Sequence, residues 1–172
     1  MTVGRGAPRG VSPAGQRLRT SAVAAALLGL DQATKALVLS RLGPAGSVRI
    51  LGPFLSFTLV RNTGAAFGLF AGATAALAVV GAAAVVAAWL LSGRTHRPRT
   101  AWALGLVLGG ALGNLVDRLL RHAVIDFVNV HVWPVFNVAD SAVTVGAILL
   151  VWSIAVAPSP APVVSRDDPT RP

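Results

Sequence analysis

The sequence contains no cysteine and no glutamate, and only 12% of its 172 residues are charged. Without cysteine, the chain cannot form a disulfide, use a thiolate as a nucleophile or bind a metal through sulfur. The low charge accompanies a hydrophobic content of 54%, which is too apolar for a small soluble domain. The low content of charged residues and the high content of hydrophobic residues favour a membrane protein.

Four apolar stretches each come close to the ~20 residues that a transmembrane helix needs. They cover residues 20–40, 71–91, 100–120 and 139–157. We therefore expect one four-helix membrane domain, residues 20–157. The first span is not expected to be a cleavable signal peptide, because it is too long and carries Asp31 and Lys35 within its apolar run. Residues 1–19 and 158–172 have the composition of disordered tails.

The distribution of basic residues predicts the orientation. Nine lie in the two tails and in the loop between the second and third spans: Arg5, Arg9, Arg17, Arg19, Arg94, Arg97, Arg99, Arg166 and Arg171. Only five lie in the other connections: Arg41, Arg49, Arg61, Arg118 and Arg121. Because basic residues concentrate on the cytoplasmic side, we expect both termini to be cytoplasmic. The net charge of +9 then reflects topology, and no nucleic-acid partner is predicted.

Two connections on the outer side have the pattern of β-strands. Apolar and polar side chains alternate in residues 54–60, and residues 124–132 are again β-prone until Trp133 and a proline end the run. We expect a small sheet at the membrane interface, where Phe54, Phe57 and Trp133 can lie among headgroups. The predicted fold is an all-α membrane bundle with a β-rich segment on its outer face.

Four of the six acidic residues lie inside or beside apolar runs: Asp31, Asp117, Asp126 and Asp140. A carboxylate near hydrocarbon is costly and is rarely kept without a partner or a task. Asp126 and Asp140 fall at the outer edge around one connection, so they can meet, share one proton and activate water, as in aspartic proteases. Alternatively, they cap helix ends, with Asn137 near Asp140. Sequence spacing leaves both hypotheses open.

Other polar residues cluster around these carboxylates. Asn114, Asp117 and Arg118 share one helix face, so they must bond to one another or face a polar cavity. Asn62 either offers its amide to a peptide backbone or tolerates a turn.

Two patterns within the spans predict packing. Asp31 and Lys35 are four residues apart in the first span, where mutual neutralisation is expected. Gly105, Gly109 and Gly113 form a small-xxx-small series in the third span, which favours close helix approach.

Other functions fit the sequence less well. His122 and His131 could join Asp126 and Asp140 as metal ligands, but their spacing matches no familiar site, and we expect no metal and no other cofactor. A transporter or proton-conducting protein would distribute its carboxylates through the bilayer, whereas these gather at one face. A structural subunit would leave the carboxylates without a purpose.

Five motifs in order carry a family resemblance: Leu30-Asp-Gln-Ala-Thr-Lys35, Arg61-Asn-Thr-Gly-Ala-Ala-Phe-Gly68, Gly109-Gly-Ala-Leu-Gly-Asn-Leu-Val-Asp-Arg118, Val124-Ile-Asp-Phe127 and Phe136-Asn-Val-Ala-Asp-Ser141. Across residues 21–156 the chain strongly resembles the bacterial lipoprotein signal peptidases (signal peptidase II). One departure is Ala123, at a position where this family usually has glycine.

The resemblance implies an aspartic endopeptidase of the bacterial cytoplasmic membrane, with its active site at the outer face. Its substrates would be prolipoproteins, cut before a cysteine that already carries diacylglycerol, and its partners would include membrane lipids. By motif position, Asp126 and Asp140 would be the catalytic pair. The residues that would line or support the substrate pocket are Asn62, Gly64, Asn114, Arg118 and Asn137. Asp31, Lys35 and Asp117 would be structural supports, and a monomer is expected.

Overall fold

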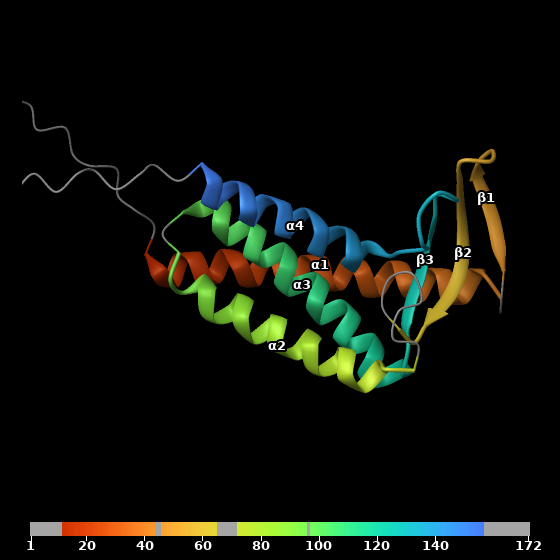
Figure 1. Ribbon diagram of the computed structural model, residues 1–172, viewed down its shortest axis with the longest axis horizontal. Helices are drawn as coiled ribbons and strands as arrows, with labels where there is room; N and C mark the ends of the chain where they lie inside the picture. The colour runs from red at the N-terminus through yellow and green to blue at the C-terminus, as the bar shows by residue number, and fades with distance from the viewer. Residues whose placement is uncertain (1–11, 44–45, 65–71, 96, 157–172) are drawn as a thin grey trace, which may run out of the picture.

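The computed structural model describes residues 12–43, 46–64, 72–95 and 97–156. The elements follow in the order α1 (Pro13–Arg41), β1 (Ser47–Leu51), β2 (Leu55–Asn62), α2 (Thr74–Ser92), α3 (Pro98–Arg121), β3 (Val124–Asn129) and α4 (Val138–Ala155). The helices lie side by side in an elongated bundle, and the three strands gather at one end of it (Figure 1). Residues 12 and 156 both lie at the end away from the sheet.

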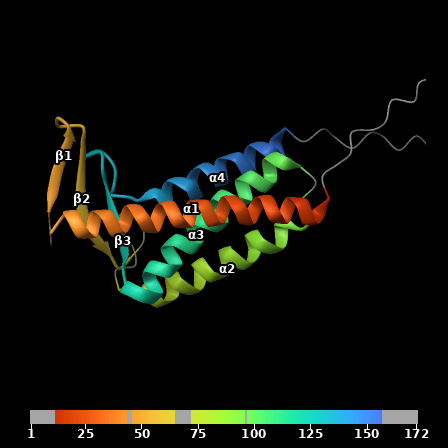
Figure 2. The ribbon, with the colours of Figure 1, turned by 180° about the vertical axis from the view of Figure 1, so that it is seen from behind.

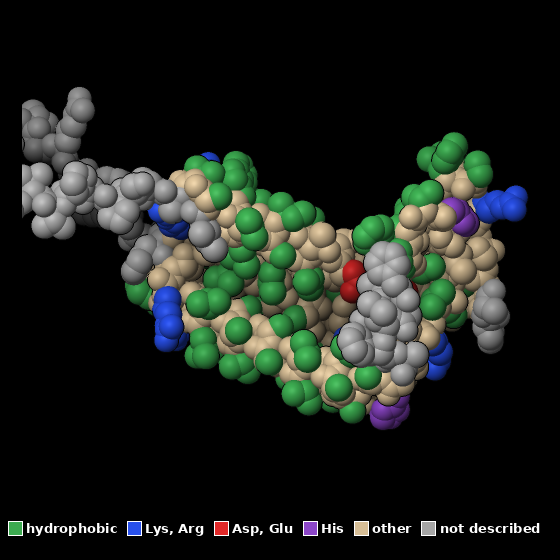
Figure 3. Space-filling view, in the orientation of Figure 1, with side chains coloured by type: hydrophobic (Ala, Val, Ile, Leu, Met, Phe, Trp, Pro, Cys, Tyr) green, Lys and Arg blue, Asp and Glu red, His purple; other side chains and the backbone are tan. Residues whose placement is uncertain are grey.

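Within the described residues, three helices are long and apolar enough to cross a membrane: α1, α2 and α3. The apolar part of α4, Val138–Ser153, is shorter than these. The protein is therefore a mostly helical membrane protein with several apolar helices and a small sheet. The outward surfaces agree with this, because large apolar side chains such as Val79, Leu90 and Val151 are exposed, and hydrophobic groups cover much of the bundle (Figure 3).

The first helix begins earlier than the sequence predicted. Residues 13–19, assigned to a disordered tail, form the first turns of α1. The Ser12 side chain accepts a hydrogen bond from the Gly15 N–H at 3.2 Å, and Pro13 occupies the first turn, as is common at helix starts. Residues 1–11 and 158–172 of the predicted tails lie outside the described residues.

Helix α3 packs against the other three helices, and its glycines allow this (Figure 2). A Cβ atom at Gly109 would lie 2.8 Å from the Ala24 carbonyl oxygen of α1, and one at Gly105 would lie 2.6 Å from Val23. On another side of α3, a Cβ at Gly110 would lie 2.5 Å from the Ala139 carbonyl oxygen of α4. Since real Cβ contacts are never so short, the predicted close helix approach is confirmed.

The sheet is antiparallel in the order β1-β2-β3. Two of the strands match the predicted β segments, whereas β1 was not predicted from the sequence. Phe127 of β3 is buried with Val38 of α1 and with Leu42, which directly follows that helix. Phe127 also meets Phe57 of β2 edge to face, with ring centroids 5.8 Å apart. These contacts fix the sheet on the end of the bundle. In the register, Val60 pairs with Asp126 and Asn62 with Val124.

Candidate active site

A pocket of about 310 Å³ with several polar lining residues lies between the helices α3 and α4 and the strands β2 and β3. Its lining residues are Asn62, Gly64, Asn114, Arg118, Val124, Asp126, Trp133, Pro134, Val135, Phe136, Asp140, Val143 and Thr144. Acidic side chains are visible in the hollow between the helices and the sheet (Figure 3). The pocket therefore contains both predicted catalytic carboxylates and four of the five predicted pocket residues.

Asp126 lies on β3 with only 2% of its surface exposed. One carboxylate oxygen accepts a hydrogen bond from the Asn62 side-chain amide at 2.9 Å, and the other accepts one from Asn137 at 2.7 Å. The antiparallel register of β2 and β3 brings Asn62 beside Asp126. Asn62 also accepts the Gly64 N–H at 2.9 Å, so this asparagine both forms a turn and holds the carboxylate.

Asp140 lies in the first turn of α4 and forms a reciprocal cap with Asn137. The Asp140 N–H donates to the Asn137 side-chain oxygen at 2.8 Å, and the Asn137 N–H donates to the Asp140 carboxylate at 3.2 Å. This is the arrangement of a capping box. The other carboxylate oxygen accepts a hydrogen bond from the Asn114 amide at 2.7 Å. The capping hypothesis for Asp140 is thus confirmed, and the same carboxylate lines the pocket.

Asn137 connects the two carboxylates. Its side-chain amide donates to Asp126 while its backbone N–H donates to Asp140. The chain reaches this position because Phe136 pairs with Val128 in an isolated bridge after the break at Trp133. Asn137 is completely buried, so the positions of both carboxylates depend on it.

The environment of Asp126 favours its protonated form. Burial first, and then the negative charge of Asp140, raise the pKa of the Asp126 carboxyl from 3.8 to a net value of about 7. The hydrogen bonds from Asn62 and Asn137 and the charge of Lys35 act in the opposite direction. A buried carboxyl with a pKa near neutrality is suited to general acid and base chemistry.

Arg118 lies at the pocket with its guanidinium directed to backbone oxygens. It makes two long contacts of 3.5 Å, to the carbonyl oxygens of Asn114 and Gly64. Asp117, one residue earlier, turns away from the pocket toward α1. The shared helix face is therefore divided: Asn114 and Arg118 line the polar cavity, and Asp117 belongs to a second polar cluster.

That second cluster contains the predicted Asp31–Lys35 pair and extends it to the third helix. The Lys35 amine lies 2.8 Å from the Asp31 carboxylate and also 2.8 Å from Asp117, and all three side chains are fully buried. Arg121 forms a further ion pair with Asp117. Two carboxylates thus face two cations, and Lys35 is shared between Asp31 of α1 and Asp117 of α3.

This ion network holds the backbone on both sides of the pocket. The Asp31 carboxylate accepts the Ala139 N–H at 3.0 Å, next to Asp140. The Asp117 carboxylate accepts the Ile125 N–H at 3.0 Å, next to Asp126. Lys35 also donates to the Asn114 side chain at 3.1 Å.

Two residues of the ion network were not predicted from the sequence. Gln32 bonds to Asp31, to Asp117 and to Arg121, and nothing in its spacing indicated this. The i, i+4 spacing of Asp117 and Arg121 would have revealed that pair.

The histidines have local roles. His122 ends α3 in the left-handed conformation, with φ 56°, and the His131 ring lies 3.2 Å from the Ser56 hydroxyl. Among the described non-glycine residues only His122 and His131 have positive φ. Ala123 therefore needs no conformation reserved for glycine.

Comparison with known proteins defines the class and then the family. Two solved structures described as bacterial membrane enzymes share this fold, each at 28% sequence identity. One has a TM-score of 0.75 and covers 79% of this chain and 87% of its own, and the other has a TM-score of 0.73 and covers 81% and 94%. Fold and pocket together define a membrane enzyme.

Residues 23–156 match the family described as signal peptidase (SPase) II. A lipoprotein signal peptidase of Mycobacterium avium is 46% identical over 154 residues, covering 86% of this chain and 84% of the relative. One of Rhodococcus jostii is 48% identical over 143 residues, covering 79% and 72%. The chain belongs to the signal peptidase II family and is a peptidase, which confirms the resemblance and decides against a transporter.

Proposed function

We propose that this protein removes signal peptides from prolipoproteins, cutting before a diacylglyceryl-modified cysteine, with Asp126 and Asp140 as the catalytic pair of an aspartic mechanism. One observation carries the assignment: the buried carboxylate of Asp126 and the half-buried carboxylate of Asp140 line one pocket, and a single residue, Asn137, bonds to both. Family membership supplies the reaction class, and the pocket supplies the residues.

The chemistry requires one proton shared by the pair. Two carboxylates that line the same partly desolvated pocket and bond to the same residue do not both ionise easily. The ionised carboxylate takes a proton from a water molecule, whose oxygen attacks the scissile carbonyl carbon. The protonated carboxyl gives its proton to the carbonyl oxygen, which forms a neutral tetrahedral intermediate. When the C–N bond breaks, the carboxyl that received the water proton delivers it to the leaving amine, and one hydroxyl of the intermediate returns its proton to the other carboxylate, which restores the starting state of the pair.

Neighbouring polar groups position the pair and the substrate. Asn62, Asn114 and Asn137 each donate an amide N–H to a carboxylate oxygen, which fixes the orientation of both carboxylates. We assign Arg118 and Gly64 to the substrate side of the pocket, because both line it and lie in contact. A guanidinium beside a backbone carbonyl can donate to a bound peptide.

The position of the pocket suits a lipidated substrate. It lies at the end of the bundle, where the helices meet the sheet. Acyl chains on the cysteine would anchor the scissile bond near the membrane interface. Trp133 lines the pocket and is 59% exposed, which fits an interfacial aromatic residue.

We further propose four membrane crossings, with both termini cytoplasmic and the pocket at the outer face. The 18 residues of α4 extend for ~27 Å, close to the ~30 Å of a hydrocarbon core. An even number of crossings agrees with residues 12 and 156 lying at the same end of the bundle. The basic residues of the α2–α3 connection, Arg94, Arg97 and Arg99, favour the cytoplasmic side for that end. We expect the monomer to contain the complete site.

The direct test is cleavage of a purified substrate. The protein in detergent is incubated with a diacylated prolipoprotein, and release of the signal peptide is followed on a gel. The matched control is the same precursor without diacylglycerol. We expect cleavage of the lipidated form only, and equal cleavage of both would contradict the proposed specificity.

A further inference from the structure

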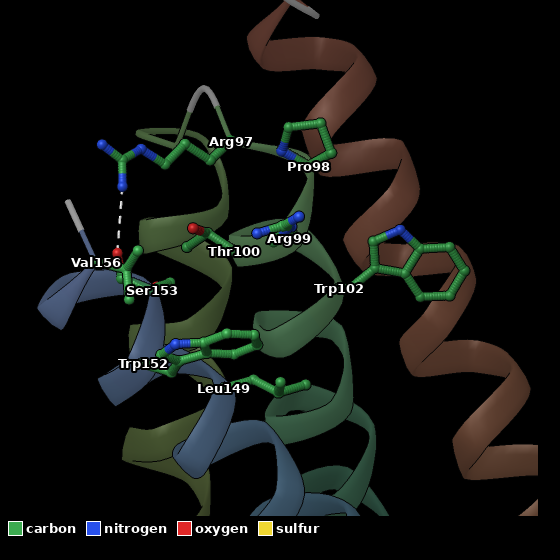
Figure 4. Close-up of a pocket in the computed structure, with 9 residues that line it drawn as sticks. All are labelled: Arg97, Pro98, Arg99, Thr100, Trp102, Leu149, Trp152, Ser153 and Val156. Carbon is green, nitrogen blue, oxygen red and sulfur yellow. Dashed lines mark hydrogen bonds between the residues drawn. The ribbon is translucent and has the colours of Figure 1, made fainter. Parts of the chain in front are cut away.

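A second cavity lies at the end of the bundle away from the sheet, between the start of α3 and the end of α4 (Figure 4). Its volume is about 630 Å³, within the ~300–1,000 Å³ range of ligand pockets. None of its lining residues lines the pocket that contains Asp126 and Asp140. The cavity is therefore separate from the peptidase site.

The rim of this cavity is positively charged. Arg97 and Arg99 both line it. Arg97 donates a hydrogen bond from Nη1 to the Ser153 carbonyl oxygen at 3.2 Å, which holds its guanidinium across the gap between α3 and α4 (Figure 4). That bond uses one of the five N–H donors of a guanidinium. The other donors can bind an anion.

Two further features strengthen the preference for an anion. No side chain among the described residues caps the N-terminus of α3, so the positive end of the helix dipole lies at the rim beside Thr100. In the described part of the chain, the carboxylates belong to the ion network or to the peptidase pocket, and none lines this cavity. Within the described residues, the positive charge at the cavity is therefore not compensated by a carboxylate.

The interior of the cavity is apolar. Leu149 and Trp152 of α4 and Trp102 of α3 line it. The Trp152 ring extends from α4 toward α3 (Figure 4) and is 56% exposed. Tryptophan and arginine together are typical of the level at which headgroups meet acyl chains. A hydrated inorganic anion would leave these apolar walls uncovered.

We propose that this cavity binds an anionic phospholipid of the adjacent leaflet. Its phosphate and headgroup lie against Arg97 and Arg99, and an acyl chain runs along Trp152 and Leu149. One lipid molecule would then compensate the positive charge of the rim and also cover the apolar wall. The proposal does not depend on the catalytic assignment, since it concerns other residues and is tested by binding.

The test compares lipids on the delipidated full-length protein by native mass spectrometry. Phosphatidylglycerol and phosphatidylcholine with identical acyl chains are titrated in parallel. We expect preferential retention of phosphatidylglycerol. Because each arginine near a lipid surface contributes about fivefold to binding of an anionic lipid, Arg97→Gln with Arg99→Gln should weaken that binding about 30-fold.

Two controls keep the test specific. Arg41→Gln with Arg49→Gln removes the same charge from exposed arginines near the sheet, and it should leave the preference intact. Trp152→Ala changes no charge but removes an apolar wall, and it should weaken retention of phosphatidylglycerol. Loss in both the arginine variant and the tryptophan variant, with retention in the control, would support the proposal.

Three results would overturn it. Equal retention of the two lipids would show that charge does not select the ligand. Equal effects of the two double arginine variants would show that net charge alone attracts the lipid. Displacement of the lipid by sodium phosphate at equal concentration, with Trp152→Ala unchanged, would identify a free-phosphate site instead.

Discussion

Replacing Lys35 by methionine removes the cation that faces two buried carboxylates while keeping a long side chain. Lys35 lies 2.8 Å from both Asp31 and Asp117, and all three are fully buried. Removing one partner from a buried ion pair typically costs about 3–5 kcal/mol, because a charge is left without compensation. Here Asp117 keeps Arg121, whereas Asp31 keeps no cation among the described residues.

The expected effect is large enough to measure in detergent. At about 2–4 °C of melting temperature per kcal/mol for a chain of this size, Lys35→Met should lower the melting temperature by about 6–20 °C. Adding Asp31→Asn to Lys35→Met removes the stranded charge and keeps an acceptor for the Ala139 N–H. The double variant should therefore be more stable than the single one.

The measurement is the melting temperature of the wild type, of Lys35→Met and of the double variant. Thermal unfolding can be followed by tryptophan fluorescence or by static light scattering. Arg49→Gln is the matched control, because Arg49 is exposed on β1 and its loss should change stability by less than about 0.5 kcal/mol. The reasoning is refuted if Lys35→Met melts with the wild type, or if the double variant is clearly less stable than the single one.

Three further predictions concern the packing at Gly113, the pKa of Asp126 and the orientation in the membrane. Gly113→Ala should destabilise the protein by about 1–3 kcal/mol, because its Cβ would lie 2.5 Å from the Asp31 carboxylate, whereas Gly29→Ala, with nothing within 4 Å, should be neutral or stabilising in thermal unfolding. The folded-state pKa of Asp126 is raised from 3.8 to about 7, so the folded state binds more protons than the unfolded state between these values. Stability should then fall as pH rises from about 4 to 7 and level off above 7, and Asp126→Asn should remove this part of the pH dependence. Single cysteines at Gly52 and His131 should react with an impermeant reagent in intact cells, while a cysteine at 96 should not; the opposite pattern would overturn the proposed orientation.

Much of the fold could be predicted because apolar runs and strand alternation are local signals. Apart from the start of α1, the four helices begin and end within a few residues of the predicted apolar stretches, and β2 and β3 overlap the predicted β segments. β1 was missed because its five residues are all exposed, so no buried face imposes an alternating pattern. The start of α1 was missed because glycine, proline and arginine around Ser12 dominate the composition there.

Most of the residues that line the candidate pocket could be predicted one by one, but the geometry of the pocket could not. Motifs indicated Asp126 and Asp140, whereas the contacts that Asn137 makes to both depend on the return of the chain at Phe136. Likewise, the pairing of Lys35 with Asp117 joins residues on different helices. Such pairs arise from close packing of α1 on α3, which sequence spacing alone does not reveal.

Asp126 and Asp140 are proposed as the catalytic pair. The most direct test is to measure cleavage of diacylated prolipoprotein by Asp126→Asn, Asp140→Asn and the double variant. Each amide is nearly isosteric with the carboxyl but cannot exchange the catalytic proton, so each single variant should fold and nearly lose cleavage. Because the pair acts as a unit, the double variant should be little worse. Asp117→Asn is the control, expected to lose stability through Lys35 and Arg121 while keeping part of its cleavage. Near-normal turnover by folded Asp126→Asn or Asp140→Asn would contradict the aspartic mechanism.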